Sequence, residues 1–113
     1  MFAKLMGLKT VSPNELHRLM QDHPVTVIDV NSRQSWVQAR VPGARNLDPL
    51  GYAERDLPSE KGSTLVFYCS NFLCRKAPNA ARRAEQMGYD DVRVMSAGIS
   101  GWLGAKLPTD SGG

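Results

Sequence analysis

Three short runs of β-branched and other apolar residues constrain the fold of this chain more than any other feature. The runs occupy residues 25–30, 65–69 and 91–95, and each is typical of a buried strand. Between the last two runs, residues 75–88 carry alanines at helical spacing. A stripe of such small side chains lets a helix lie close to a sheet. Strands alternating with helices predict an α/β fold, a doubly wound parallel sheet flanked by helices.

The remaining segments give the expected domain limits. A capping-box pattern at residues 12–15 predicts a helix that ends before Pro24. With 113 residues the chain has room for one domain. We expect residues 1–10 to be an N-terminal extension or first strand, residues 11–108 to be the folded domain, and residues 109–113 to be a flexible tail.

Composition narrows the functional classes. A net charge of +3 is typical of a solvated surface rather than of a nucleic-acid binder. Because no apolar run approaches the roughly 20 residues of a membrane helix and no signal-peptide pattern is seen, we expect a cytoplasmic protein without a membrane partner. The two cysteines and the two histidines lack the spacing of metal ligands, so no metal and no cofactor are expected.

The segment that follows the second strand carries the chemistry. Cys69 ends this strand, and a helix is expected to start about six residues later. Ligands of open α/β sheets bind at this edge, where a loop and a helix N-terminus can direct N–H groups at an anion. Such a cradle lowers the pKa of a thiol, so Cys69 is the candidate nucleophile. The candidate substrate-binding residues are Ser70, Asn71, Phe72, Leu73, Cys74, Arg75 and Lys76.

Several roles in this loop stay open. Arg75 suits an oxyanion because its charge is permanent and its donors are fixed. Cys74 is either a packing residue at the helix start or a second thiol that attacks a sulfur bound to Cys69. Phe72 and Leu73 either rim the pocket or pack beneath it. Asp29, at the end of the first strand, is expected to support the loop through hydrogen bonds rather than to transfer a proton.

Ordered landmarks along the chain resemble the rhodanese family of sulfurtransferases. The resemblance runs from about Val11 to Pro108 and rests on motifs in their usual order. They are the strand Val27-Ile28-Asp29-Val30, the turn Val41-Pro42-Gly43-Ala44, the loop start Tyr68-Cys69, the helix residues Ala80-Ala81, and Ala97-Gly98-Ile99 with Trp102.

The resemblance implies a rhodanese-like fold and a persulfide on Cys69. In this scheme thiosulfate or a persulfide donor supplies the sulfur, and a thiol, a protein acceptor or cyanide receives it in a second step. The chain departs from the family pattern in its loop, where five residues separate Cys69 from Arg75, one more than usual. The anion-binding role therefore falls to Arg75 or to Lys76.

Two alternative functions follow from the same residues. The longer loop resembles those of rhodanese-fold phosphatases and arsenate reductases, although residues 70–74 include no carboxylate to protonate a leaving group. The other alternative is a non-catalytic redox or recognition module in which Cys69 and Cys74 form a reversible disulfide. Sulfur transfer is the leading hypothesis.

Overall fold

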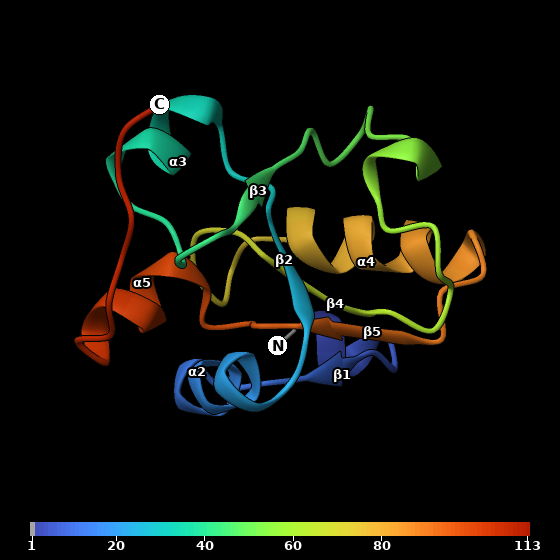
Figure 1. Cartoon of the computed structure of the whole chain (residues 1–113), viewed down its shortest axis with the longest axis horizontal. Coiled ribbons are helices and arrows are strands. Elements are labelled where there is room, and N and C mark those ends of the chain that lie inside the picture. Colours follow the sequence, from blue (N-terminus) through green and yellow to red (C-terminus); the bar gives the residue numbers. More distant parts are fainter. Residues whose placement is uncertain (1) are drawn as a thin grey trace.

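The chain folds around a five-stranded sheet whose adjacent strands are all parallel (Figure 1). We describe a computed structural model, which covers residues 2–113. The strand order is β1-β5-β4-β2-β3, so β4 is the central strand. The strands are β1 (Lys9–Thr10), β2 (Val25–Asp29), β3 (Arg45–Asn46), β4 (Thr64–Tyr68) and β5 (Asp91–Val94). This architecture confirms the predicted doubly wound α/β class.

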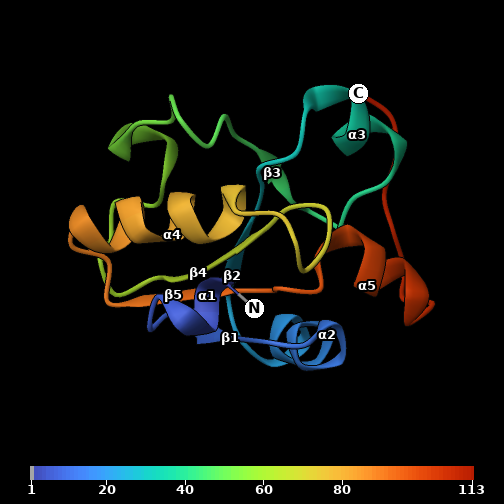
Figure 2. The same cartoon turned by 180° about the vertical axis from the view of Figure 1, so that it is seen from behind.

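Helices cover both faces of the sheet (Figures 1 and 2). They are α1 (Phe2–Leu5), α2 (Pro13–Asp22), α3 (Arg33–Gln38), the 3₁₀ turn η1 (Glu54–Asp56), α4 (Lys76–Gln86) and α5 (Gly98–Gly104). One core joins α1 and α4 to the sheet, and a second core joins α2 and α5 to the opposite face. Because successive residues of β4 point alternately into the two cores, the strand is apolar throughout.

The helix boundaries follow local rules where the sequence carries a signal. Ser12 and Glu15 form the predicted capping box, in which Glu15 N–H donates to Ser12 Oγ and Ser12 N–H donates to a Glu15 carboxylate oxygen. In α4, Pro78 lies within the first turn, where its missing N–H leaves no helical hydrogen bond unmade. The short α1 was not predicted, because a single turn of helix depends on packing, here of the buried Ala3.

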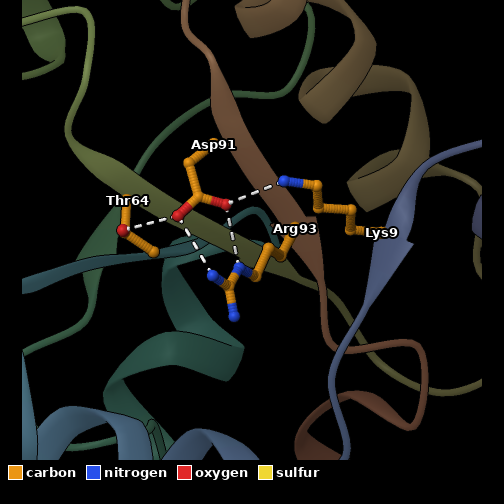
Figure 3. A network of polar contacts seen from close by, with 4 residues as sticks. All are labelled: Lys9, Thr64, Asp91 and Arg93. Atoms are coloured by element: carbon orange, nitrogen blue, oxygen red, sulfur yellow. Dashed lines mark hydrogen bonds and ion pairs between the residues drawn. The ribbon is translucent and has the colours of Figure 1, made fainter.

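The amino edge of the sheet is held by a polar network (Figure 3). Asp91 accepts hydrogen bonds from Thr64 Oγ1 at 2.8 Å and from Arg93 Nε at 2.9 Å, and Lys9 Nζ lies 3.6 Å from its carboxylate. The bonds from Arg93 hold the pKa of Asp91 down at about 2. The network joins β1, β4 and β5 at the edge opposite to the one that follows Tyr68.

The C-terminal residues lie against α3 and the segment that follows it. Arg40 and Asp110 exchange backbone hydrogen bonds of 3.0 Å, and Gly112 N–H donates to Val37 O at 2.8 Å. The flexibility expected of residues 109–113 stays a prediction. Within residues 2–113, no helix is both long and apolar enough to cross a bilayer.

Candidate functional site

Cys69 lies directly after the central strand, at the carboxyl edge of the sheet. Its side chain packs in the core on the α4 side, and the residue is 3% exposed. Its carbonyl accepts a 2.9 Å hydrogen bond from Ile99 N–H, and the Ser70 carbonyl accepts a 3.0 Å bond from Ser100 N–H. The first turn of α5 thus fixes the backbone that carries the cysteine.

This attachment requires a glycine at the start of α5. Gly98 has a φ of +64°, which side chains rarely allow. A Cβ atom there would stand 2.5 Å from the Ser70 carbonyl carbon and 2.6 Å from the Cys69 oxygen. The sequence contained this residue in the Ala97-Gly98-Ile99 motif, but the close approach to residues 69–70 emerges only from the packing.

The loop after Cys69 turns back on itself at Asn71. Leu73 N–H donates to Asn71 Oδ1 at 2.9 Å, and Cys74 N–H donates to the Asn71 carbonyl at 3.1 Å. This turn brings Cys74 back to Cys69, with the two Cα atoms 6.4 Å apart, and the two sulfur atoms are joined as a disulfide. The structure therefore joins the two cysteines whose pairing the sequence offered as one alternative.

The anion cradle expected from the sequence is only partly available in this disulfide form. The N–H groups of Leu73 and Cys74 serve the turn and donate to Asn71. Within residues 2–113, the N–H groups of Phe72 and Arg75 donate to no protein acceptor. These groups remain free to bind an anion at the entrance to α4.

Arg75 and Lys76, the two candidate anion-binding residues, lie in different surroundings. The Arg75 guanidinium carbon lies 4.4 Å from the centre of the Phe2 ring on α1. Lys76 lines a separate depression of about 360 Å³ together with Asn31 and Asp48. The contact with Phe2 was not predicted, because it depends on how α1 packs.

Phe72 and Leu73 are exposed at 57% and 77%, so the loop presents both to solvent. Phe72 also lines a small cavity of about 10 Å³ beside Cys69 and Cys74. The same cavity is bordered by Ser96, whose hydroxyl oxygen is buried and has no hydrogen-bond partner among residues 2–113. Sequence reasoning missed Ser96, since a serine after a strand carries no distinctive signal.

A buried polar chain supports the site from the other side of β4. Asp29 accepts hydrogen bonds from Tyr68 Oη at 2.7 Å and from Asn31 N–H at 2.8 Å. Tyr68 Oη in turn accepts from Val41 N–H at 3.1 Å. Burial raises the pKa of Asp29, while the bond from Tyr68 opposes this change. These bonds fasten the turn at Val41 to β2 and β4.

Asn31 carries this support into the loop. Its side-chain oxygen accepts a 3.0 Å hydrogen bond from Ser70 Oγ, and its carbonyl accepts from Asn46 Nδ2 at 2.9 Å. Ser70 is thereby held at both its side chain and its carbonyl. Of the predicted loop residues, Ser70, Asn71 and Cys74 are held by hydrogen bonds or by the disulfide. The Arg75 guanidinium lies against Phe2, and Lys76 lines the depression at Asn31.

Comparison with known protein families gives a match over most of the chain. The model of the rhodanese-like domain matches residues 12–105. An HTH-type transcriptional regulator of Mycobacterium tuberculosis is 32% identical over 98 residues, covering 87% of this chain and 43% of that protein. The thiosulfate sulfurtransferase GlpE of Shewanella oneidensis is 27% identical over 104 residues, covering 87% of this chain and 95% of that protein. The chain spans about half the length of the first two curated relatives, at 43% and 55%.

Solved structures agree with the observed fold. The BH2092 protein from Bacillus halodurans superimposes with a TM-score of 0.83 at 18% identity, over 97% of this chain and 81% of that one. A rhodanese from E. coli, solved with anions, gives a TM-score of 0.66 at 25% identity, over 79% of this chain and 100% of that one.

Proposed function

Because this chain belongs to the rhodanese-like domain family, we propose that it is a sulfurtransferase that carries sulfane sulfur as a persulfide on Cys69. The observation that carries the proposal is the position of Cys69, at the carboxyl end of the central strand and before the N-terminus of α4. Ligands of α/β sheets bind at this edge. The similarity to GlpE sulfurtransferases supports the same chemistry.

The reaction has two displacement steps. The Cys69 thiolate attacks the outer sulfur of thiosulfate, the bond between the two sulfur atoms of thiosulfate breaks, and sulfite leaves with the bonding electrons. An acceptor thiolate or cyanide then attacks the outer sulfur of the Cys69 persulfide, and Cys69 leaves as a thiolate. Two half-reactions on one nucleophile predict ping-pong kinetics.

The residues around Cys69 can assist both steps. The N–H groups of Phe72 and Arg75, together with the N-terminus of α4, offer donors to the anionic donor and to the persulfide. Hydrogen bonds from α5 to residues 69 and 70 hold the nucleophile in place. Of the two candidate cations, Arg75 needs only to leave the face of Phe2 to reach an anion at the loop.

The cycle starts from the reduced cysteine pair. A disulfide between Cys69 and Cys74 removes the nucleophile, so the protein must be reduced before it can accept sulfur. We place the protein in the cytoplasm, where thiols are kept reduced. Its acceptor is then a small thiol or a thiol of another protein.

A sulfite assay tests the proposal directly. The reduced protein, freed of reductant under anaerobic conditions, is mixed with thiosulfate, and we expect about one equivalent of sulfite per chain. Cyanide present in excess from the start should capture sulfur from the Cys69 persulfide as thiocyanate. Cys69→Ser should abolish both, whereas Ser59→Ala, an exposed position distant in sequence from the loop, should change neither.

The same reduced protein also tests the alternative function, that of a phosphatase or an arsenate reductase. The loop of five residues between Cys69 and Arg75 is compatible with larger oxyanions, and a second thiol lies within it. Turnover of an aryl phosphate or of arsenate that exceeds sulfur transfer would reverse the assignment. Absence of sulfite release with thiosulfate and with persulfide donors would refute sulfur transfer by Cys69.

A further inference from the structure

We propose that Cys74 is a resolving thiol that discharges the Cys69 persulfide within the same chain and releases hydrosulfide. This inference rests on the proposed function, since it starts from the persulfide. It adds a second activity, the reduction of sulfane sulfur to sulfide at the expense of a dithiol. The sulfur then leaves as hydrosulfide, reduced by the cysteine pair, instead of passing to an external thiol or cyanide.

The geometry of the two cysteines favours attack by Cys74 on Cys69. Cys69 is fixed because its carbonyl and that of Ser70 accept hydrogen bonds from α5. Cys74 is presented by the turn at Asn71, which is closed by two hydrogen bonds of 2.9 and 3.1 Å. The Cα separation of 6.4 Å allows direct bonding of the two sulfur atoms, as the structure has it.

The length of the loop also favours a role for Cys74 as the second thiol. Five residues separate Cys69 from Arg75, and residues 71–74 form the turn that returns the chain to Cys69. Asn71 serves this turn with both its carbonyl and its side chain. The loop that exceeds the usual rhodanese pattern therefore has a structural use. Its turn places the Cys74 thiol beside Cys69.

Access to the persulfide favours Cys74 over a dissolved acceptor. Cys69 is 3% exposed, and Cys74 packs at the margin of the same core. A bulky external thiol must enter the loop to reach the outer sulfur of the persulfide, whereas Cys74 Sγ lies within bonding distance of Cys69 Sγ, the atom that it attacks. A held intramolecular nucleophile has a far higher effective concentration than a dissolved one.

The first turnover needs no reactant other than the Cys69 persulfide and the Cys74 thiolate. The Cys74 thiolate attacks Sγ of Cys69, the bond from that atom to the outer sulfur breaks, and the outer sulfur leaves as hydrosulfide with the bonding electrons. The sulfane sulfur is reduced, and the two cysteines are oxidised to the disulfide. An external dithiol must then reduce the disulfide by thiol exchange before another turnover.

The Ser96 hydroxyl can assist the release of hydrosulfide. This buried group has no partner in the described part of the chain. It borders the cavity of about 10 Å³ beside both cysteines, which is close to the space of one water-sized group. A hydroxyl in this position can donate a hydrogen bond to the departing hydrosulfide. The cavity thus joins the reacting sulfur atoms to the one buried side-chain oxygen or nitrogen that lacks a partner within residues 2–113.

The test is a single turnover with two products measured. Reduced wild type and Cys74→Ser, both freed of reductant, are mixed anaerobically with thiosulfate, and sulfite, hydrosulfide and intact protein mass are followed together. We expect wild type to release sulfite and hydrosulfide in equal amounts and to lose two hydrogen atoms as the disulfide forms. Cys74→Ser should release sulfite, gain one sulfur atom and keep it, with hydrosulfide at least about tenfold slower.

The outcomes separate the two proposals. If wild type keeps the added sulfur as Cys74→Ser does, and releases no more hydrosulfide, Cys74 does not resolve the persulfide, but sulfur transfer by Cys69 stands. If neither protein releases sulfite with thiosulfate or gains sulfur from a persulfide donor, both proposals fail. Persulfide formation by Cys74→Ser also demonstrates that this variant is folded, so a low hydrosulfide yield cannot be attributed to unfolding.

Discussion

Replacing Gly98 with alanine should destabilise the domain strongly, because two separate costs fall on one residue. A side chain at φ +64° costs about 1–2 kcal/mol. The new Cβ would also stand 2.5–2.6 Å from the backbone of residues 69 and 70, which no change of rotamer can relieve. Overpacking of this kind costs about 1–3 kcal/mol. We therefore expect the free energy of unfolding to fall by about 2–5 kcal/mol.

Urea denaturation followed by tryptophan fluorescence measures this loss, since Trp102 is buried in α5 itself. With a urea dependence of about 2 kcal/mol per molar, the midpoint should fall by roughly 1–2.5 M. The matched control is Gly104→Ala at the end of the same helix, where a Cβ meets nothing within 4 Å. This variant should be neutral, or more stable by up to about 1 kcal/mol.

The variant also reports on the site. Because α5 donates hydrogen bonds to the carbonyls of Cys69 and Ser70, Gly98→Ala should slow sulfite release from thiosulfate under conditions in which the protein is still folded. A change in stability of less than about 0.5 kcal/mol, a value usual for surface substitutions, would refute the close packing described here.

Two further substitutions test the polar networks. Tyr68→Phe removes the hydroxyl that donates to Asp29 and accepts from Val41, so the free energy of unfolding should fall by about 1–3 kcal/mol. Measured in urea at several pH values, this loss should be larger where Asp29 is ionised. Equal losses at every pH would contradict a hydrogen bond from Tyr68 to the Asp29 carboxylate. Asp91→Asn should cost about 1 kcal/mol at neutral pH, a modest value because the partners of Asp91 are partly exposed. Since the folded pKa of Asp91 is lowered from 3.8 to about 2, this contribution is present above pH 3.8 and is lost as the pH falls through about 2. Urea midpoints of both proteins should therefore converge in acid, and a constant difference would refute the role of the carboxylate.

Local patterns were sufficient to predict the architecture. The apolar runs of β2, β4 and β5 predict buried strands because both faces of a parallel sheet are covered, and the alanines of α4 predict close packing on that sheet. Given this order of elements, a parallel sheet places the end of β4 at its carboxyl edge. The location of Cys69 was therefore available from the sequence, as was the capping box of α2.

Tertiary structure decided what surrounds Cys69. The turn at Asn71 determines that Cys74 meets Cys69, and the packing of α1 determines that Arg75 lies on Phe2. The support from Gly98 likewise depends on a contact with residues 69 and 70, more than 25 positions away along the chain. Strands and helices are specified by periodicities within a few residues, whereas the partners of a side chain are set by how distant segments pack. For this protein the sequence therefore predicted the position of Cys69, and the packing of distant segments decided its neighbours.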